Sequence, residues 1–278
     1  MAGPIEAVAR RAGEPLPTPA VVASLLRARR LVQRNLLVYR HGWIIIVSGF
    51  FEPLFYLLGI GFGLGSLVRG IELADGRTIP YQAFVAPGLL AMSTMNGAIA
   101  ESIFNVFFKL NFSRTYEGIL ATPLGIREIA IGELIWSLMR GGMYVIAFLG
   151  VMLALGLILS PWAVLILPAA ILLGAAFSAA GLATTAYLRT VQDFDLPMGL
   201  VVMPMFLFSG TFFPTTAYPV PVQWLMELTP LFHGTNLFRG LSTGLLEPRL
   251  AWDLAYLIVF CGLCLWIAMR QMERKLIK

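Results

Sequence analysis

The chain has 278 residues, of which 58% are hydrophobic and 13% are charged, and its mean hydropathy is +0.81. Soluble domains carry about 25% charged residues, so this composition excludes a protein with an ordinary water-exposed surface. The net charge is +5, but the basic residues lie between apolar runs rather than in one patch with aromatic residues, which argues against nucleic-acid binding. We therefore expect an integral membrane protein.

The N-terminal part of the chain is predicted to lie in the cytoplasm. Residues 1–20 are rich in Pro, Ala and Arg and contain no apolar core of a cleavable signal peptide, so we expect a flexible tail. Residues 21–39 have apolar side chains spaced by three and four residues with arginines opposite. This pattern is typical of a helix in the plane of the membrane interface. The alternative is a solvated helix packed on the protein's own loops.

Six apolar stretches are long enough to cross a bilayer, which takes about 20 helical residues. Backbone polar groups in lipid must be paired within the segment, so these stretches are predicted to be helices. They cover residues 43–64, 84–104, 134–159, 162–187, 197–213 and 251–267. The sequence thus predicts an all-α fold with one membrane domain over residues 21–278.

The distribution of basic residues predicts the orientation of these spans. With the N-terminus inside, fifteen Lys and Arg residues lie on the inner side and four lie outside, namely Arg69, Arg77, Arg239 and Arg249. The positive-inside rule therefore places both termini in the cytoplasm.

Three connections between the spans are informative. The inner link, residues 109–128, is long and mixed in character. The outer link, residues 214–250, contains a semi-apolar stretch at 222–241 that Pro230 interrupts, so we expect re-entrant or surface helices at the outer leaflet. Only Ser160 and Pro161 separate the third and fourth spans, which predicts an antiparallel hairpin.

Enzymatic readings find little support in the sequence. The two histidines, His41 and His233, fall on opposite sides of the membrane, and no nucleophile elbow or zinc-protease motif is present. The glycine-rich run at 59–65 lacks the Lys-Ser/Thr of a phosphate loop. Cys261 and Cys264 are expected to be packing residues rather than metal ligands. We predict that the chain is not an enzyme, holds no metal and binds no cofactor directly.

Four charged residues fall within or beside the predicted spans, where charges are costly and often functional. They are Glu52, Glu101, Glu133 and Arg140. Glu133 and Arg140 are about two helical turns apart and should not pair, so Arg140 is expected to pair with Glu52 or Glu101. A structural ion pair and a role in substrate passage both remain open for these groups.

Several segments resemble type-2 ABC transporter permeases. Residues 116–134, YEGILATPLGIREIAIGEL, are similar to the coupling segment of that family. FSGTFFP at 208–214, followed by Trp224, Pro230, His233 and Arg239, resembles the end of the fifth span and the outer re-entrant helices. EPLFYLL at 52–58 and FVAPGLLAM at 84–92 are similar to the branch that exports nodulation lipo-oligosaccharides, and daunorubicin-type drug exporters are close relatives. The resemblance covers residues 25–265.

The resemblance implies that two permease copies, or two related subunits, form a pore in the bacterial plasma (inner) membrane. Each would bind a separate cytosolic ATPase that holds ATP and Mg. A coupling helix near residues 113–127 would dock on that ATPase, and the interfacial helix would make a second contact. The implied coupling residues are a polar rim and an apolar anchor: Arg114, Glu117, Arg127 and Glu128, with Ile119, Leu120 and Leu124.

The implied activity is export of an amphiphile, either a lipid-linked saccharide or a glycolipid, from the cytoplasm or inner leaflet. Multidrug or antibiotic efflux is the alternative within the same superfamily, and an ion-coupled carrier or membrane scaffold is a remote one. The substrate would enter between span one of one protomer and span five of the other. The aromatic residues there suit an acyl chain or planar drug: Phe50, Phe51, Phe55, Phe206 and Phe208.

Overall fold

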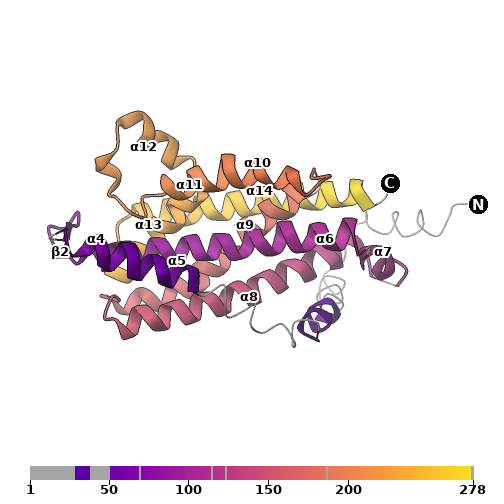
Figure 1. Ribbon diagram of the computed structural model, residues 1–278, viewed down its shortest axis with the longest axis horizontal. Helices are drawn as coiled ribbons and strands as arrows, with labels where there is room; N and C mark the ends of the chain where they lie inside the picture. Colours follow the sequence, from indigo (N-terminus) through magenta and orange to yellow (C-terminus); the bar gives the residue numbers. More distant parts are fainter. Residues whose placement is uncertain are drawn as a thin grey trace, which may run out of the picture.

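The computed structural model describes residues 29–37, 51–68, 70–113, 115–122, 124–185 and 187–276. The predicted tail at residues 1–20, most of the predicted interfacial helix and the first part of the predicted first span lie outside these ranges. In the described part, long helices run side by side along the longest axis of the molecule (Figure 1). The predicted all-α character is therefore seen directly, apart from one two-stranded hairpin.

Among the described residues, four helices are long and apolar enough to cross a membrane. They are Tyr81–Asn111 (α5 Tyr81–Ile99, η2 Ala100–Asn105, α6 Val106–Asn111), α8 Ile126–Ala154, Pro161–Thr185 (η3 Pro161–Leu165, α9 Ile166–Thr185), and Arg249–Met272 within α14 Arg249–Leu276. These correspond to the second, third, fourth and sixth predicted spans.

The first and fifth predicted spans are shorter in the described residues. The first is the helix Phe51–Gly65, which contains η1 Leu57–Phe62 and α4 Gly63–Gly65. The fifth is a helical segment over residues 192–207, divided into η4 Gln192–Phe194, α10 Asp195–Pro197, η5 Met198–Val202 and α11 Met203–Leu207. The predicted end of this span at residue 213 was wrong, because the chain turns after Leu207 and Gly210 adopts a φ of 71° that favours glycine.

The two ends of the helix bundle carry different connections (Figure 1). At one end lie the hairpin of β1 Ile71–Glu72 and β2 Thr78–Ile79, together with η6 Thr215–Ala217, α12 Val220–Glu227 and α13 Pro230–Thr243. At the other end lie α7 Thr115–Leu120 and the C-terminal end of α14. The predicted helical character of residues 222–241 is confirmed.

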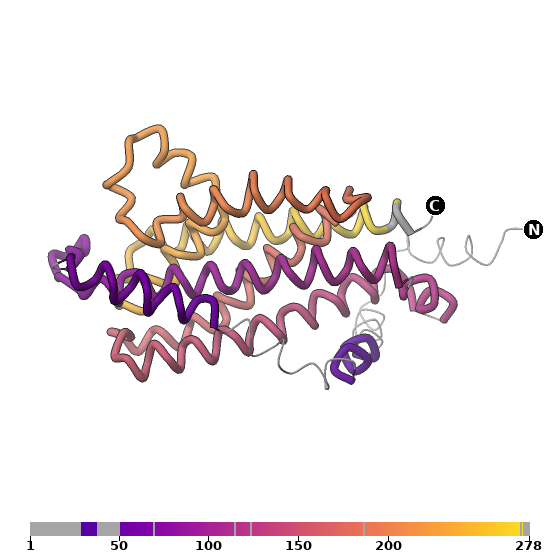
Figure 2. Tube along the Cα trace, in the orientation of Figure 1, coloured from indigo at the N-terminus to yellow at the C-terminus, as the bar shows by residue number. Residues whose placement is uncertain are grey.

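The helix over residues 29–37 lies at the same end as α7. Figure 2 shows it nearly end-on, across the direction of the long helices. A helix in the plane of the membrane interface would lie crosswise to the spans in this way. α8 and α9 pack against each other, which confirms the predicted hairpin, although its connection starts earlier than predicted because α8 ends at Ala154.

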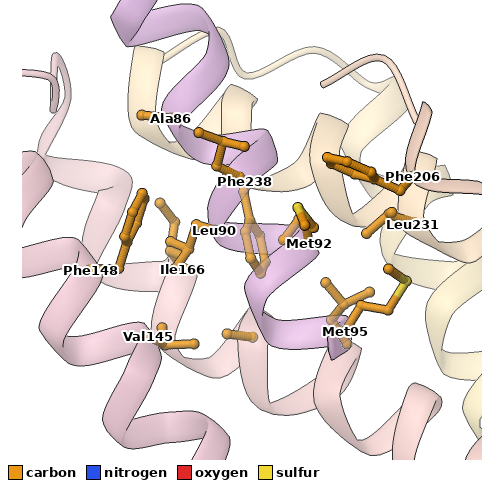
Figure 3. Packing of buried hydrophobic residues seen from close by; sticks show 14 of the residues in the cluster. Ala86, Leu90, Met92, Met95, Val145, Phe148, Ile166, Phe206, Leu231 and Phe238 are labelled. Carbon is orange, nitrogen blue, oxygen red and sulfur yellow. The ribbon is translucent and has the colours of Figure 1, made fainter. Parts of the chain in front are cut away.

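Tyr81–Asn111 is the central helix of the bundle. In its apolar window 83% of residues are buried, against 28% for α8 and 22% for Arg249–Met272. Figure 3 shows α5 passing between Phe148 and Ile166 on one side and Phe206 and Leu231 on the other. The outer faces of α8 and α14 remain apolar and exposed, as expected for helices that face lipid.

Candidate functional site

A buried polar cluster joins four elements at the α7 end of the molecule. Lys109 of α6 donates from Nζ to both carboxylate oxygens of Glu133 in α8, each at 2.8 Å. The Tyr116 hydroxyl of α7 donates to Glu133 Oε1 at 3.1 Å. Asn35, from the helix over residues 29–37, donates to Glu133 Oε2 at 3.5 Å and accepts from Lys109 at 3.4 Å. We call these four residues the Lys109 cluster.

The Lys109 cluster is closed to solvent. All four residues are at most 8% exposed, and Leu31, Ile129, Leu182 and Met272 belong to the apolar shell around Tyr116. Burial and the neighbouring Glu133 carboxylate raise the pKa of Tyr116 well above its usual value, so the phenol keeps its proton and donates. Separating these elements would leave a buried charge without its partner, which costs free energy. The cluster therefore holds the four elements together.

The predicted coupling helix is shorter in the structure than in the prediction. α7 covers Thr115–Leu120 rather than residues 113–127. Arg127 and Glu128 belong to the first turn of α8, where the Glu128 carboxylate accepts the Gly125 N–H at 3.0 Å and caps the helix. Glu128 is therefore 8% exposed and stabilises α8 rather than forming an open polar rim.

The other predicted coupling residues divide into exposed and packed ones. Glu117 is exposed on α7. Ile119 and Leu120 are half-buried and pack against the apolar shell of the Lys109 cluster. Leu124 is half-buried in the link to α8, and Arg114 lies outside the described residues. The exposed surface of α7 thus centres on Glu117 and its neighbour Gly118.

The second polar group lies halfway along the bundle. Arg140 forms an ion pair with Glu101, one of the two partners predicted for it, and donates from Nε to the Tyr144 hydroxyl at 3.1 Å. As predicted, Arg140 does not pair with Glu133, which binds Lys109. α8 runs from Ile126 to Ala154, so Arg140 is its middle residue, about 21 Å from either end at 1.5 Å per residue.

A cavity of about 410 Å³ opens beside this ion pair. Its polar lining comprises Glu52, Ser93, Asn96, Arg140 and Tyr144, and we call it the Arg140 cavity. Asn96 donates to Glu52 Oε1 at 3.4 Å. Three of the helices around the cavity contain π-helical segments, η1, η2 and η5. Such segments widen a helix locally and occur often at functional sites.

The structure does not bring the predicted aromatic residues together into one surface. Phe51 and Phe55 stack at 5.9 Å on an exposed face next to Glu52. Phe206 is buried in edge contact with Tyr56 at 6.1 Å. Phe208 lines a separate apolar hollow between the 192–207 segment and α9, α12 and α14. Phe50 lies outside the described residues.

The predicted outer residues mainly hold their helices in place. Arg239 of α13 donates to the carbonyl oxygens of Phe84 at 3.1 Å and Gly210 at 2.7 Å, and its guanidinium lies 3.8 Å from the centre of the Phe84 ring. His233 is fully buried, with Nδ1 2.5 Å from Asp253 Oδ1 of α14, and it donates from Nε2 to the Glu227 carbonyl at 2.9 Å. These contacts join α13 to α5, α12 and α14.

Pro230 and Trp224 have simpler surroundings. Pro230 stands in the first turn of α13, where its missing N–H costs no hydrogen bond. Trp224 on α12 is 70% exposed, at the end of the bundle that carries the hairpin (Figure 1). An exposed tryptophan at this level fits the aromatic belt of a membrane interface.

Sequence reasoning missed three members of the Lys109 cluster: Asn35, Lys109 and Tyr116. One sequence feature could have identified the cation. Lys109 is the only lysine before residue 275, in a chain whose other seventeen basic residues up to that point are arginines. A lysine at the end of a span, facing a glutamate at the start of the next, is a candidate for a buried pair.

Residues 27–242 match the ABC-2 type transporter family. The chain is 30% identical over 246 residues to nodulation protein J of Sinorhizobium fredii (strain NBRC 101917 / NGR234), which covers 88% of this chain and 92% of the relative. It is 31% identical over 215 residues to nodulation protein J of Rhizobium meliloti (strain 1021), covering 76% and 79%. It is also 28% identical over 201 residues to the inner membrane transport permease YadH of Escherichia coli (strain K12), covering 70% and 76%.

The family match includes α7, the Lys109 cluster and the whole lining of the Arg140 cavity. Members of this family are membrane transport components rather than enzymes, and they normally pair with an ABC ATPase. The resemblance of the coupling segment and the observed membrane-length helices agree with this match. The chain therefore belongs to the ABC-2 type transporter family.

Proposed function

We propose that this chain is the permease subunit of an ATP-driven exporter that moves an amphiphile out of the cytoplasm or the inner leaflet. The observation that carries the proposal is the Lys109 cluster. Glu133, on a membrane-length helix, is bound by side chains from α6, α7 and the helix over residues 29–37. A partner that pushes on α7 thereby moves α8 directly.

The ATPase is a separate cytosolic chain that binds ATP and Mg, and the working unit has two permease copies and two ATPase copies. Closure of the ATPase pair presses on α7 around Glu117. The permease then shifts between packings open to the inside and to the outside. Such a shift needs two states of comparable free energy, because nucleotide can bias them only by its differential binding.

We propose six crossings of a bacterial inner membrane with both termini in the cytoplasm. Connectivity supports the two short segments as crossings. The helix over residues 29–37 lies at the α7 end, while Gly65 leads to the hairpin at the opposite end (Figure 1). Likewise α9 ends near the Lys109 cluster and α14 starts at the other end. In this proposal the chain crosses through residues 192–207 and through a first span of which the structure describes residues 51–65.

The substrate is an amphiphile such as a lipid-linked saccharide or glycolipid. The Arg140 cavity offers polar groups for a head. A second hollow of about 460 Å³, lined almost entirely by apolar residues such as Leu200, Phe208 and Phe260, offers space for a hydrocarbon chain. Ile99 lines both, and residues of η5 border both. The exposed Phe51 and Phe55 would flank the route by which the amphiphile enters.

Drug efflux within the same superfamily is the second candidate. The observation that favours it is Glu52, a carboxylate at the Arg140 cavity that suits a cationic drug.

The coupling assignment is tested by ATP hydrolysis in the complex of the permease with its partner ATPase. Glu117→Arg reverses the charge on the exposed face of α7 and should lower permease-dependent ATPase activity about tenfold, since it replaces a docking contact with repulsion. Glu247→Arg, the same change at an exposed site in the link between α13 and α14, is the control. Equal activity of the two variants and the unmodified complex would remove α7 from coupling.

A further inference from the structure

The Arg140 cavity contains one carboxylate that the described residues leave without a cation. Arg140 is paired with Glu101. Glu52 has the Asn96 amide at 3.4 Å, and no basic group among the described residues lies within ion-pair distance of it. With all three groups ionised, Glu52, Glu101 and Arg140 together carry one net negative charge.

This arrangement determines which polar heads the cavity favours. A phosphate or sulfate head would meet the like charge of Glu52 in the cavity and be repelled by it. A head that donates hydrogen bonds would instead find acceptors in the Glu52 carboxylate and the Asn96 carbonyl. Hydrogen bonds to charged groups are about twice as strong as neutral ones. Sugar hydroxyls and protonated amines both supply such donors.

The position of Glu52 supports a role in binding rather than in packing. The residue is exposed to the cavity rather than buried among other helices. It precedes Pro53 and the π-helical η1 on the same helix, so its stretch of backbone is irregular. Tyr144 and Phe104 add aromatic surface to the cavity, which suits both sugar rings and ammonium groups.

We propose that Glu52 and Asn96 form the head-group site for a non-anionic amphiphile whose head donates hydrogen bonds. The inference rests on the proposed function, because it specifies the substrate of the same permease. It also assigns roles within the site: Glu52 accepts from the head, Asn96 orients the Glu52 carboxylate, and Arg140, whose charge Glu101 compensates, is part of the lining.

Photolabelling of the purified full-length chain in lipid nanodiscs tests this site without any ATPase. Three amphiphiles share one alkyl chain and a diazirine next to the head, and they differ in having a glucoside, a primary ammonium or a phosphate head. Labelling of the peptides with Asn96 and Tyr144 is divided by labelling of the exposed apolar face of α14, which corrects for partitioning into the bilayer. The glucoside, the ammonium or both should label the cavity at least about tenfold more than the phosphate.

Variants of Glu52 distinguish the two sources of donors. Glu52→Ala should lower labelling by the favoured head about tenfold, the effect of losing roughly 1.4 kcal/mol. Glu52→Gln keeps an accepting oxygen without charge, so it should spare the glucoside and reduce the ammonium. Glu247→Gln is the control. If Glu52→Ala does not fold, Asn96→Ala, which frees the carboxylate, takes its place with the same expectation.

Two results would overturn the head-group site. One is phosphate labelling equal to that of the other heads. The other is that Glu52→Ala, or its replacement Asn96→Ala, leaves the labelling of the cavity unchanged for every head. Neither result would contradict the proposed coupling of α7 to an ATPase, since the nanodisc contains only the permease. Conversely, a failure of the Glu117→Arg test would leave selective labelling of the cavity intact.

Discussion

Glu133 accepts four hydrogen bonds from three side chains that come from different parts of the chain. Lys109→Met should therefore destabilise the protein by about 3–5 kcal/mol, because it leaves the Glu133 carboxylate buried without its cation. The midpoint of heat-induced aggregation of the detergent-purified chain measures this loss. Arg77→Met is the control, since the Arg77–Asp75 pair is exposed and such pairs contribute about 1 kcal/mol or less.

A double-mutant cycle separates the interaction energy of the Lys109–Glu133 pair from the effects of each substitution on its other neighbours. Lys109→Met combined with Glu133→Gln should lose clearly less stability than the sum of the single changes, since the double variant has no stranded charge. Strictly additive losses would mean that the two side chains do not interact.

The limits of sequence reasoning are visible at single residues. The Arg140–Glu101 pair could be predicted as one of two alternatives, because charges in a span need a partner within reach. Asn35 could not be placed at Glu133, which lies 98 residues further along the chain, because helical periodicity contains no information on which helices meet. The Arg140 cavity was likewise beyond prediction, since it depends on π-helical segments that no apolar pattern reveals.

At the scale of elements, the positions of the spans followed from apolar runs, but their ends did not. α8 begins at Ile126, eight residues before the predicted residue 134. The early turns contain Glu128, which the sequence placed in the inner link, and Glu133, which it placed at the start of the span. In the structure Glu128 caps the helix and Glu133 pairs with Lys109. Partner groups from distant segments thus extend a helix beyond its hydrophobic run.

The link between α7 and α8 can be tested without denaturing the protein. Tyr116→Phe removes one hydrogen bond to Glu133 but preserves the packing of the ring. Hydrogen exchange of the α7 amides should accelerate about fivefold to tenfold, as expected for the loss of about 1–1.4 kcal/mol of local stability. α12, at the opposite end of the molecule (Figure 1), is the internal reference and should not change. Unaltered exchange in α7 would mean that Glu133 does not hold this helix.

At the scale of the whole molecule, six crossings make a definite prediction about the two faces of the membrane. In a background with Cys261→Ser and Cys264→Ser, single cysteines at Gly118 and Gln192 should react with an impermeant maleimide only from the cytoplasmic side. Cysteines at Gly76 and Glu247 should react only from the outside. All four positions are exposed. Gln192 and Glu247 labelled from the same side would show that residues 192–207 do not cross.

The central claim is that ATP hydrolysis on a partner chain drives an amphiphile through this permease. Its most direct test is transport in proteoliposomes that contain the permease, with its α7 end facing outward, and its partner ATPase. A fluorescent single-chain glycolipid is followed as it leaves the leaflet on the α7 side. We predict movement that requires ATP and Mg and that Glu117→Arg reduces about tenfold while Glu247→Arg does not. The same assay is repeated with an amphiphile that has an amine head. A complex that hydrolyses ATP yet moves neither amphiphile would contradict the account.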